Sequence, residues 1–170
     1  MRLFISISVP AKFNGYLKKF QNEYEGIKKT SDFHITIQFL GNDIDEEKRE
    51  DIIESLSSIL FHPFEIVLGD AMPFGHPKNP EGIWTECHID SEGMRLASNV
   101  RNKMKDCDFV SNQPFRAHIT LGRYTDSPGF FPNKTKGEPH SFVVKDFSLI
   151  QSQPSSSGSK YKAIETFVAR

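Results

Sequence analysis

A four-residue pattern that places an imidazole near a hydroxyl occurs twice in the sequence. His34-Ile-Thr-Ile37 and His118-Ile-Thr-Leu121 both read histidine, aliphatic, threonine, aliphatic, and the two histidines lie 118 − 34 = 84 residues apart. The ordinary pKa of histidine, about 6.5, leaves both its protonated and its neutral form available near neutral pH. Two such side chains could therefore act on one substrate as a general acid and a general base.

The spacing inside each copy is that of one face of a β-strand. Side chains at i and i+2 project from the same face, and those at i+1 and i+3 project from the other. His34 and Thr36 therefore share a face, as do His118, Thr120 and Tyr124, while the aliphatic residues between them turn toward a core. One copy alone would also fit a half-exposed strand. The repetition favours two equivalent strands that face each other across a pseudo-two-fold axis.

Phosphodiester opening needs this combination of groups. One proton must leave the attacking water, another must reach the departing oxygen, and the two imidazoles could divide these tasks. The threonine hydroxyls could donate hydrogen bonds to the non-bridging oxygens, which gather negative charge. For this chemistry nucleophile and leaving group must lie on opposite sides of phosphorus, where the two histidines would stand.

A metal centre is the competing use of histidine. Catalytic zinc takes three protein ligands and structural zinc four, often at short spacings, whereas this chain has no His-x-x-x-His or Cys-x-x-Cys and its two cysteines are isolated. We therefore expect neither a metal nor another cofactor. Four histidines lack a threonine partner and are interpreted as surface or structural residues: His62, His76, His88 and His140.

Hydrophobic periodicity predicts the elements that position these side chains. Alternation predicts strands over residues 3–9, 33–39, 64–68, 83–89, 117–123, 142–150 and 161–169. Three- and four-residue spacing predicts helices over residues 13–27, from about 45 to 60, and 91–104 with Ser91 as the N-cap. Residues 73–82 and 125–140 are predicted to be loops. The mixture is typical of an α+β fold with an antiparallel bias.

Length and composition limit the number of domains and the kinds of partner that we expect. The chain of 170 residues fits one domain, and its net charge of −1 favours a local contact with nucleic acid over coating of a long polymer. No apolar run approaches the ~20 residues that span a membrane. With only two cysteines and no signal-peptide pattern at the start, we expect a cytoplasmic protein without membrane contact, acting as a monomer.

The paired motifs and their flanks resemble a known family, the two-histidine (2H) phosphoesterases, and within it the RNA 2′,3′-cyclic phosphodiesterase branch, once described as RNA 2′-5′ ligases. The resemblance covers nearly the whole chain, at residues 1–10, 33–41, 114–123 and 157–161. It implies one bilobal domain over residues 1–170. Two antiparallel sheets would face each other across a central groove, with the helices outside and each sheet lending one motif.

The resemblance also implies a reaction. His34 would donate a proton to the leaving 3′ oxygen and His118 would accept one from water, so that a 2′,3′-cyclic phosphate on an RNA end or a nucleotide becomes a 2′-phosphomonoester. Other activities stay open: hydrolysis of 2′,5′-linked oligonucleotides, joining of tRNA halves, and RNA-end binding without turnover.

Four residues besides the histidines are candidates for substrate binding: Thr36, Thr120, Arg123 and Tyr124. Arg123 matches the family pattern, yet strict alternation puts it on the face away from His118, where a structural salt bridge is an equal alternative. Tyr124, like Phe115 and Tyr161, could stack on a base or belong to the core. The chain departs from the branch at Ala117, where Pro is usual, and at Gly122, where Ala is usual.

Overall fold

The computed structural model describes residues 1–170 and contains nine strands and three α-helices. The strands are β1 (Arg2–Ser8), β2 (Ile27–Lys29), β3 (His34–Gly41), β4 (Phe64–His76), β5 (Asn79–Ile89), β6 (His118–Tyr124), β7 (Ser141–Val144), β8 (Asp146–Ser155) and β9 (Gly158–Val168). The helices are α1 (Asn14–Asn22), preceded by the 3-10 turn η1 (Ala11–Phe13), α2 (Glu46–Ser57) and α3 (Ser91–Asp106). None of the helices has both the length and the apolar character needed to cross a membrane.

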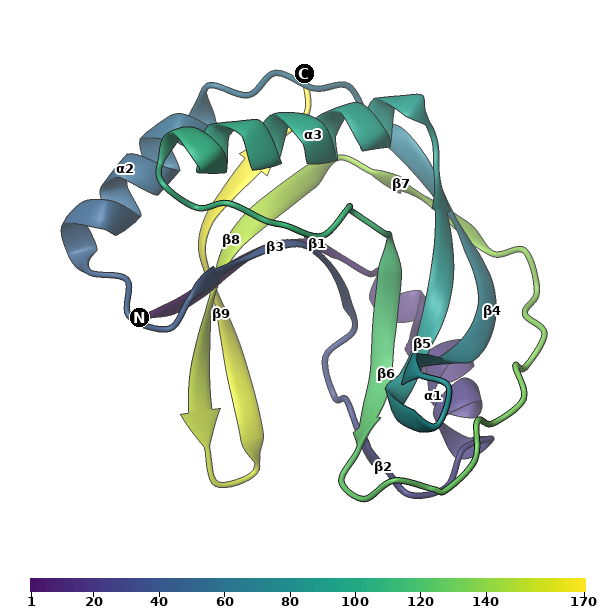
Figure 1. The fold of residues 1–170 in the computed structure, drawn as a ribbon. Coiled ribbons are helices and arrows are strands. Elements are labelled where there is room, and N and C mark those ends of the chain that lie inside the picture. Colours follow the sequence, from purple (N-terminus) through teal and green to yellow (C-terminus); the bar gives the residue numbers. More distant parts are fainter.

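The strands form two antiparallel sheets that make the two legs of an arch (Figure 1). One sheet has the order β3-β1-β8-β9 and the other the order β2-β6-β5-β4-β7. Apart from β2, each strand of one sheet has a counterpart in the other, with β3 matching β6 and β1 matching β5. The predicted α+β fold, with two sheets, outer helices and internal duplication, is confirmed.

The duplication extends to an irregularity in each motif strand. Ile5 pairs with Gln38 and Ser6 with Thr36, so that Ile37 has no partner on β1. Likewise Ile83 pairs with Gly122 and Trp84 with Thr120, which leaves Leu121 without a partner on β5. Each strand thus carries a β-bulge at the third residue after its histidine. A bulge inserts one extra residue, so side chains beyond it change face.

Aspartate side chains cap the N-termini of α2 and α3, and a glycine allows α3 to pack closely. Asp45 accepts a hydrogen bond from Lys48 N at the start of α2, and Asp90 accepts one from Gly93 N at the start of α3. The N-cap of α3 is therefore Asp90, and the prediction of Ser91 is wrong by one residue. At Gly93 a Cβ would lie 2.3 Å from Ile89 Cγ1, so this glycine permits close packing of α3. One hydrophobic cluster of 35 buried residues includes side chains from both sheets and all three helices.

Three segments differ from the prediction. The strand predicted over residues 142–150 is divided at Lys145 into β7, in the five-stranded sheet, and β8, in the four-stranded sheet. Residues 73–82 are not a loop: β4 and β5 continue as a hairpin to the pair His76–Asn79, and the Phe74 ring stacks on Trp84 with centroids 4.7 Å apart. Cross-strand aromatic packing outweighs the proline and glycine content there. The first helix ends at Asn22, and residues 27–29 form β2, which pairs with β6. Residues 125–140 are irregular, as predicted.

Gly122 explains how β2 can approach β6. A Cβ at this position would lie 2.8 Å from the Lys28 carbonyl oxygen, closer than real Cβ contacts allow. The absence of a side chain therefore permits the pairing of Lys29 with Gly122 and of Lys28 with Arg123. Glycine at this position therefore has a local structural reason.

Candidate active site

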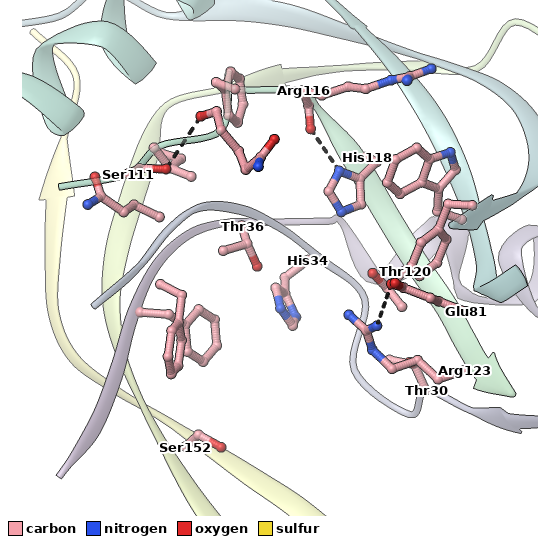
Figure 2. Close-up of a pocket in the computed structure, with 18 of the residues that line it drawn as sticks. Thr30, His34, Thr36, Glu81, Ser111, Arg116, His118, Thr120, Arg123 and Ser152 are labelled. Carbon is pink, nitrogen blue, oxygen red and sulfur yellow. Dashed lines mark hydrogen bonds and ion pairs between the residues drawn. The ribbon is translucent and has the colours of Figure 1, made fainter. Parts of the chain in front are cut away.

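The structure brings the two motif copies to one pocket between the sheets. This pocket, of about 1070 Å³, is lined by His34 and Thr36 from β3 and by His118 and Thr120 from β6. Figure 2 shows the four side chains around a common space, each histidine on its own strand. The two strands contact each other directly, although their sequences lie far apart. Burial of the alternating aliphatic residues in the core holds both strands with the imidazoles facing this space.

A backbone contact fixes the tautomer of His118. Its Nδ1 lies 2.7 Å from the Arg116 carbonyl oxygen. A carbonyl only accepts, so Nδ1 carries the proton and donates it, and the lone pair of the neutral ring is on Nε2. The ring also packs against Trp84, with centroids 4.3 Å apart. Burial lowers the pKa of His118; the positive charges of Arg116 and Arg123 and the neighbouring His34 lower it further, while the Arg116 carbonyl opposes the shift.

His34 has different surroundings. Its ring forms a cluster with two aromatic rings, with centroids 5.1 Å from Phe4 and 5.4 Å from Tyr161, which lie 5.5 Å from each other. Burial lowers the pKa of His34, and Asp32 opposes this shift through both its carboxylate and its backbone carbonyl. The two histidines thus share desolvation and a carbonyl two residues upstream. They differ in the sign of the charge beside them.

The bulge in β6 overturns the predicted face of Arg123. Beyond Leu121 the alternation is shifted by one residue, so Arg123 lies on the His118 face and lines the pocket. Its guanidinium lies 5.3 Å from the centroid of the Phe74 ring and 4.0 Å from the Glu81 carboxylate. Figure 2 shows Arg123 with Glu81, on the Thr120 side of the pocket.

The same bulge removes Tyr124 from the site. The expectation that Tyr124 shares a face with His118 is wrong, because after the inserted residue its side chain turns to the opposite face. The ring packs against the hydrophobic core and beside Gly26, and Tyr124 does not line the pocket. Desolvation raises the pKa of its hydroxyl, with a smaller effect from Tyr24. Tyr124 therefore stabilises the β2–β6 edge.

Several pocket residues were not found from the sequence. These are Arg2, Trp84, Arg101 and Arg116, which line the pocket together with Phe115 and Tyr161, for which the sequence left stacking and core roles open. Arg116 had a signal, because it lies two residues before His118 and therefore on the same side of an extended chain. Trp84 and Arg101 had none, since they reach the pocket only through strand pairing and helix packing.

None of the four histidines that lack a threonine partner in the sequence lines this pocket. His140 lies 3.3 Å from the Glu138 carboxylate, and its ring centroid lies 4.5 Å from that of Tyr16, on the segment that is hydrogen-bonded along the edge of β4. No three histidine, cysteine, aspartate or glutamate side chains gather as a set that could hold a metal ion.

Comparison with known proteins places this architecture in a family. The model of the LigT-like phosphoesterase family matches residues 7–84. The RNA 2′,3′-cyclic phosphodiesterase of Archaeoglobus fulgidus is 32% identical, over 98% of this chain and 99% of that protein. The protein of the same name from Methanocaldococcus jannaschii is 29% identical over 80% of this chain and 76% of its own length.

Solved structures show the same fold. The protein TT0787 of Thermus thermophilus superposes with a TM-score of 0.86 at 24% identity, covering 100% of this chain and 98% of that one. E. coli LigT complexed with 3′-AMP superposes with a TM-score of 0.84 at 23% identity, covering 99% and 97%.

Fold and site together define a two-histidine phosphoesterase, as the motifs predicted. More particularly, the chain belongs to the LigT-like phosphoesterases, and it is an enzyme of the hydrolase class.

Proposed function

We propose that the chain hydrolyses 2′,3′-cyclic phosphate ends of RNA to 2′-phosphomonoesters, without a metal ion, with His34 as the acid and His118 as the base. The observation that carries this proposal is the convergence of the two imidazoles on one pocket. The curated relatives bear the name RNA 2′,3′-cyclic phosphodiesterase, which supports the choice of substrate.

The charges around each imidazole support the division of roles. A proton is favoured on His34 by Asp32 and disfavoured on His118 by Arg116 and Arg123. A proton on His34 also disfavours a proton on His118, so these charges favour His34 as the site of the proton in a singly protonated pair. That singly protonated pair, with the proton on His34, is the form the reaction needs.

The proposed step balances in atoms and protons. Water attacks phosphorus and gives a proton to Nε2 of His118, which is available because Nδ1 is engaged by the Arg116 carbonyl. The bond from phosphorus to the 3′ oxygen breaks, and His34 supplies the proton to that oxygen. Thr36, Thr120 and Arg123 would donate hydrogen bonds to the non-bridging oxygens, where negative charge increases. Solvent then restores the protonation of both rings.

One experiment tests the reaction and the roles together. The purified chain is incubated with a nucleoside 2′,3′-cyclic phosphate in the presence of EDTA, and ³¹P NMR identifies the product. We expect turnover that yields the 2′-phosphate. Activity that EDTA abolishes and zinc restores would contradict the metal-free chemistry. A 3′-phosphate product would mean that the wrong oxygen was assigned as the leaving group, and binding without turnover would identify a non-catalytic module.

A further inference from the structure

The charge of the pocket lining differs from that of the whole chain. The net charge of the chain is −1, yet the pocket is lined by four arginines and a single carboxylate, Glu81. The four arginines are Arg2, Arg101, Arg116 and Arg123. Positive charge is therefore concentrated at the site itself, as expected for a surface that receives a polyanion.

Only two of these arginines are free of a carboxylate. Arg116 contacts Glu86 at 2.9 Å and Arg123 contacts Glu81 at 4.0 Å. Arg2 and Arg101 take part in no salt bridge of the structure. The uncompensated positive charge of the pocket thus belongs to Arg2 and Arg101.

Both free arginines lie on the β3 side of the pocket. The Arg2 guanidinium lies 5.0 Å from the centroid of the Phe39 ring, three residues after Thr36 on the same strand. Arg101 of α3 donates to Ser111 Oγ and to the Gln113 carbonyl. Figure 2 shows Ser111 on the Thr36 side of the pocket, whereas Arg123 and Glu81 lie on the Thr120 side. One end of the pocket therefore carries two arginines without a carboxylate partner, whereas at the other end the charge of Arg123 is offset by Glu81.

The two cations are held in place and keep donors available. The hydrogen bonds of Arg101 use only Nη2, so Nε and Nη1 can still donate. Arg2 packs on the Phe39 ring, which carries no negative charge that would neutralise the guanidinium. The pocket, of about 1070 Å³, is at the upper end of the ~300–1,000 Å³ that is usual for pockets that bind small ligands.

We propose that Arg2 and Arg101 form a phosphate-binding subsite for the RNA strand upstream of the cyclic end, so that an oligonucleotide is preferred to a nucleoside cyclic phosphate. This inference rests on the proposed function for the position of the cyclic end. The strand would leave the site along β3 toward the segment at Ser111, with its phosphodiesters on the two guanidiniums. The Glu81 end would receive no backbone phosphate.

The first test compares substrates. We expect kcat/KM for a hexaribonucleotide 2′,3′-cyclic phosphate to exceed that for a nucleoside 2′,3′-cyclic phosphate, and Arg2→Gln to reduce this preference by about tenfold, the share of a charged hydrogen bond. Arg95→Gln is the matched control, because Arg95 lies on α3, pairs with Glu92 and does not line the pocket. Equal kcat/KM for both substrates in the unmodified chain would overturn the subsite.

The second test needs no turnover. Binding of a single-stranded hexaribonucleotide with a terminal 2′-phosphate is measured as a function of salt, where each phosphate contact contributes about 0.7 to the slope of log K against log salt. Arg2→Gln should lower the slope by about that amount, Arg2→Lys should keep it, and Arg95→Gln should leave it unchanged. Arg101→Gln should act like Arg2→Gln, with thermal melting to check that the segment at Ser111 stays folded.

Failure of the proposed subsite and failure of the proposed hydrolysis would give different results. A salt slope that Arg2→Gln leaves intact would refute the subsite even if cyclic phosphates are hydrolysed. Oligonucleotide binding with the expected slope changes, but without hydrolysis of any cyclic phosphate, would support the subsite and refute the proposed function.

Discussion

The β3 half and the β6 half of the pocket share a backbone and differ in the side chains around it. Each half presents a histidine and a threonine from a strand that bulges at the third residue after the histidine. In each half the carbonyl two residues upstream, of Asp32 or of Arg116, opposes the lowering of the histidine pKa. The repeated backbone explains why two groups of the same kind converge on one point.

The side chains outside the motif make the halves unequal. His34 is flanked by Phe4, Tyr161 and the Asp32 carboxylate. His118 is flanked by Trp84 and by two guanidiniums. Duplication therefore supplies two imidazoles in similar backbone settings, and in the proposed mechanism the neighbouring charges decide which one carries the proton. An acid and a base can arise from the same motif without any change in its own residues.

The largest expected effect comes from removing either imidazole. His34→Ala and His118→Ala should each lower kcat by roughly 10²–10⁴-fold, the usual contribution of a positioned acid or base. The double variant should lose much less than the product of the two losses, because groups that act as a unit are not additive. Single-turnover kinetics with a cyclic phosphate measure this, with circular dichroism to verify folding. Full activity in either single variant would refute its assigned role.

A smaller effect is expected from the hydroxyls. Thr36→Val and Thr120→Val keep the shape of the side chain but remove a donor to the non-bridging oxygens, and each should lower kcat by about 10²-fold, the lower end for an oxyanion donor. Thr30→Val offers a comparison, since Thr30 also lines the pocket but lies outside both motifs. Equal effects at positions 36 and 120 would show that the halves share the negative charge. A change in KM alone would indicate that the hydroxyls only bind the ground state.

The smallest effects, and the sharpest test of the comparison, concern the flanking charges. The proposed mechanism needs protonated His34 and neutral His118, so kcat/KM should fall at alkaline pH as His34 loses its proton and at acid pH as His118 gains one. Because burial lowers the pKa of both rings, the two limbs should lie below pH 6.5. Asp32→Asn should shift the alkaline limb to lower pH, and Arg116→Gln should shift the acid limb to higher pH. The opposite assignment predicts that each substitution moves the other limb.

The motif strands and much of the fold were predictable because their signals are local. Alternating aliphatic residues identify β1, β3 and β6, and three- and four-residue spacing identifies α2 and α3 within a few residues. The β4–β5 hairpin through residues 76–79 was not predicted, because its proline and glycine content indicates a loop when pairing and stacking on Trp84 are not visible. The short β2 was missed for a similar reason, since it gains stability only by pairing with β6.

The sequence by itself determined the two histidines and two threonines, since the strand period places each pair on one face wherever the strand lies. Only the tertiary structure decided what surrounds them. The bulge that turns Arg123 into the pocket and Tyr124 out of it arises from pairing with β5, and a one-residue shift exchanges the faces of every later side chain. The positions of Arg2, Arg101 and Trp84 depend likewise on contacts between residues far apart in the chain, which no local pattern encodes.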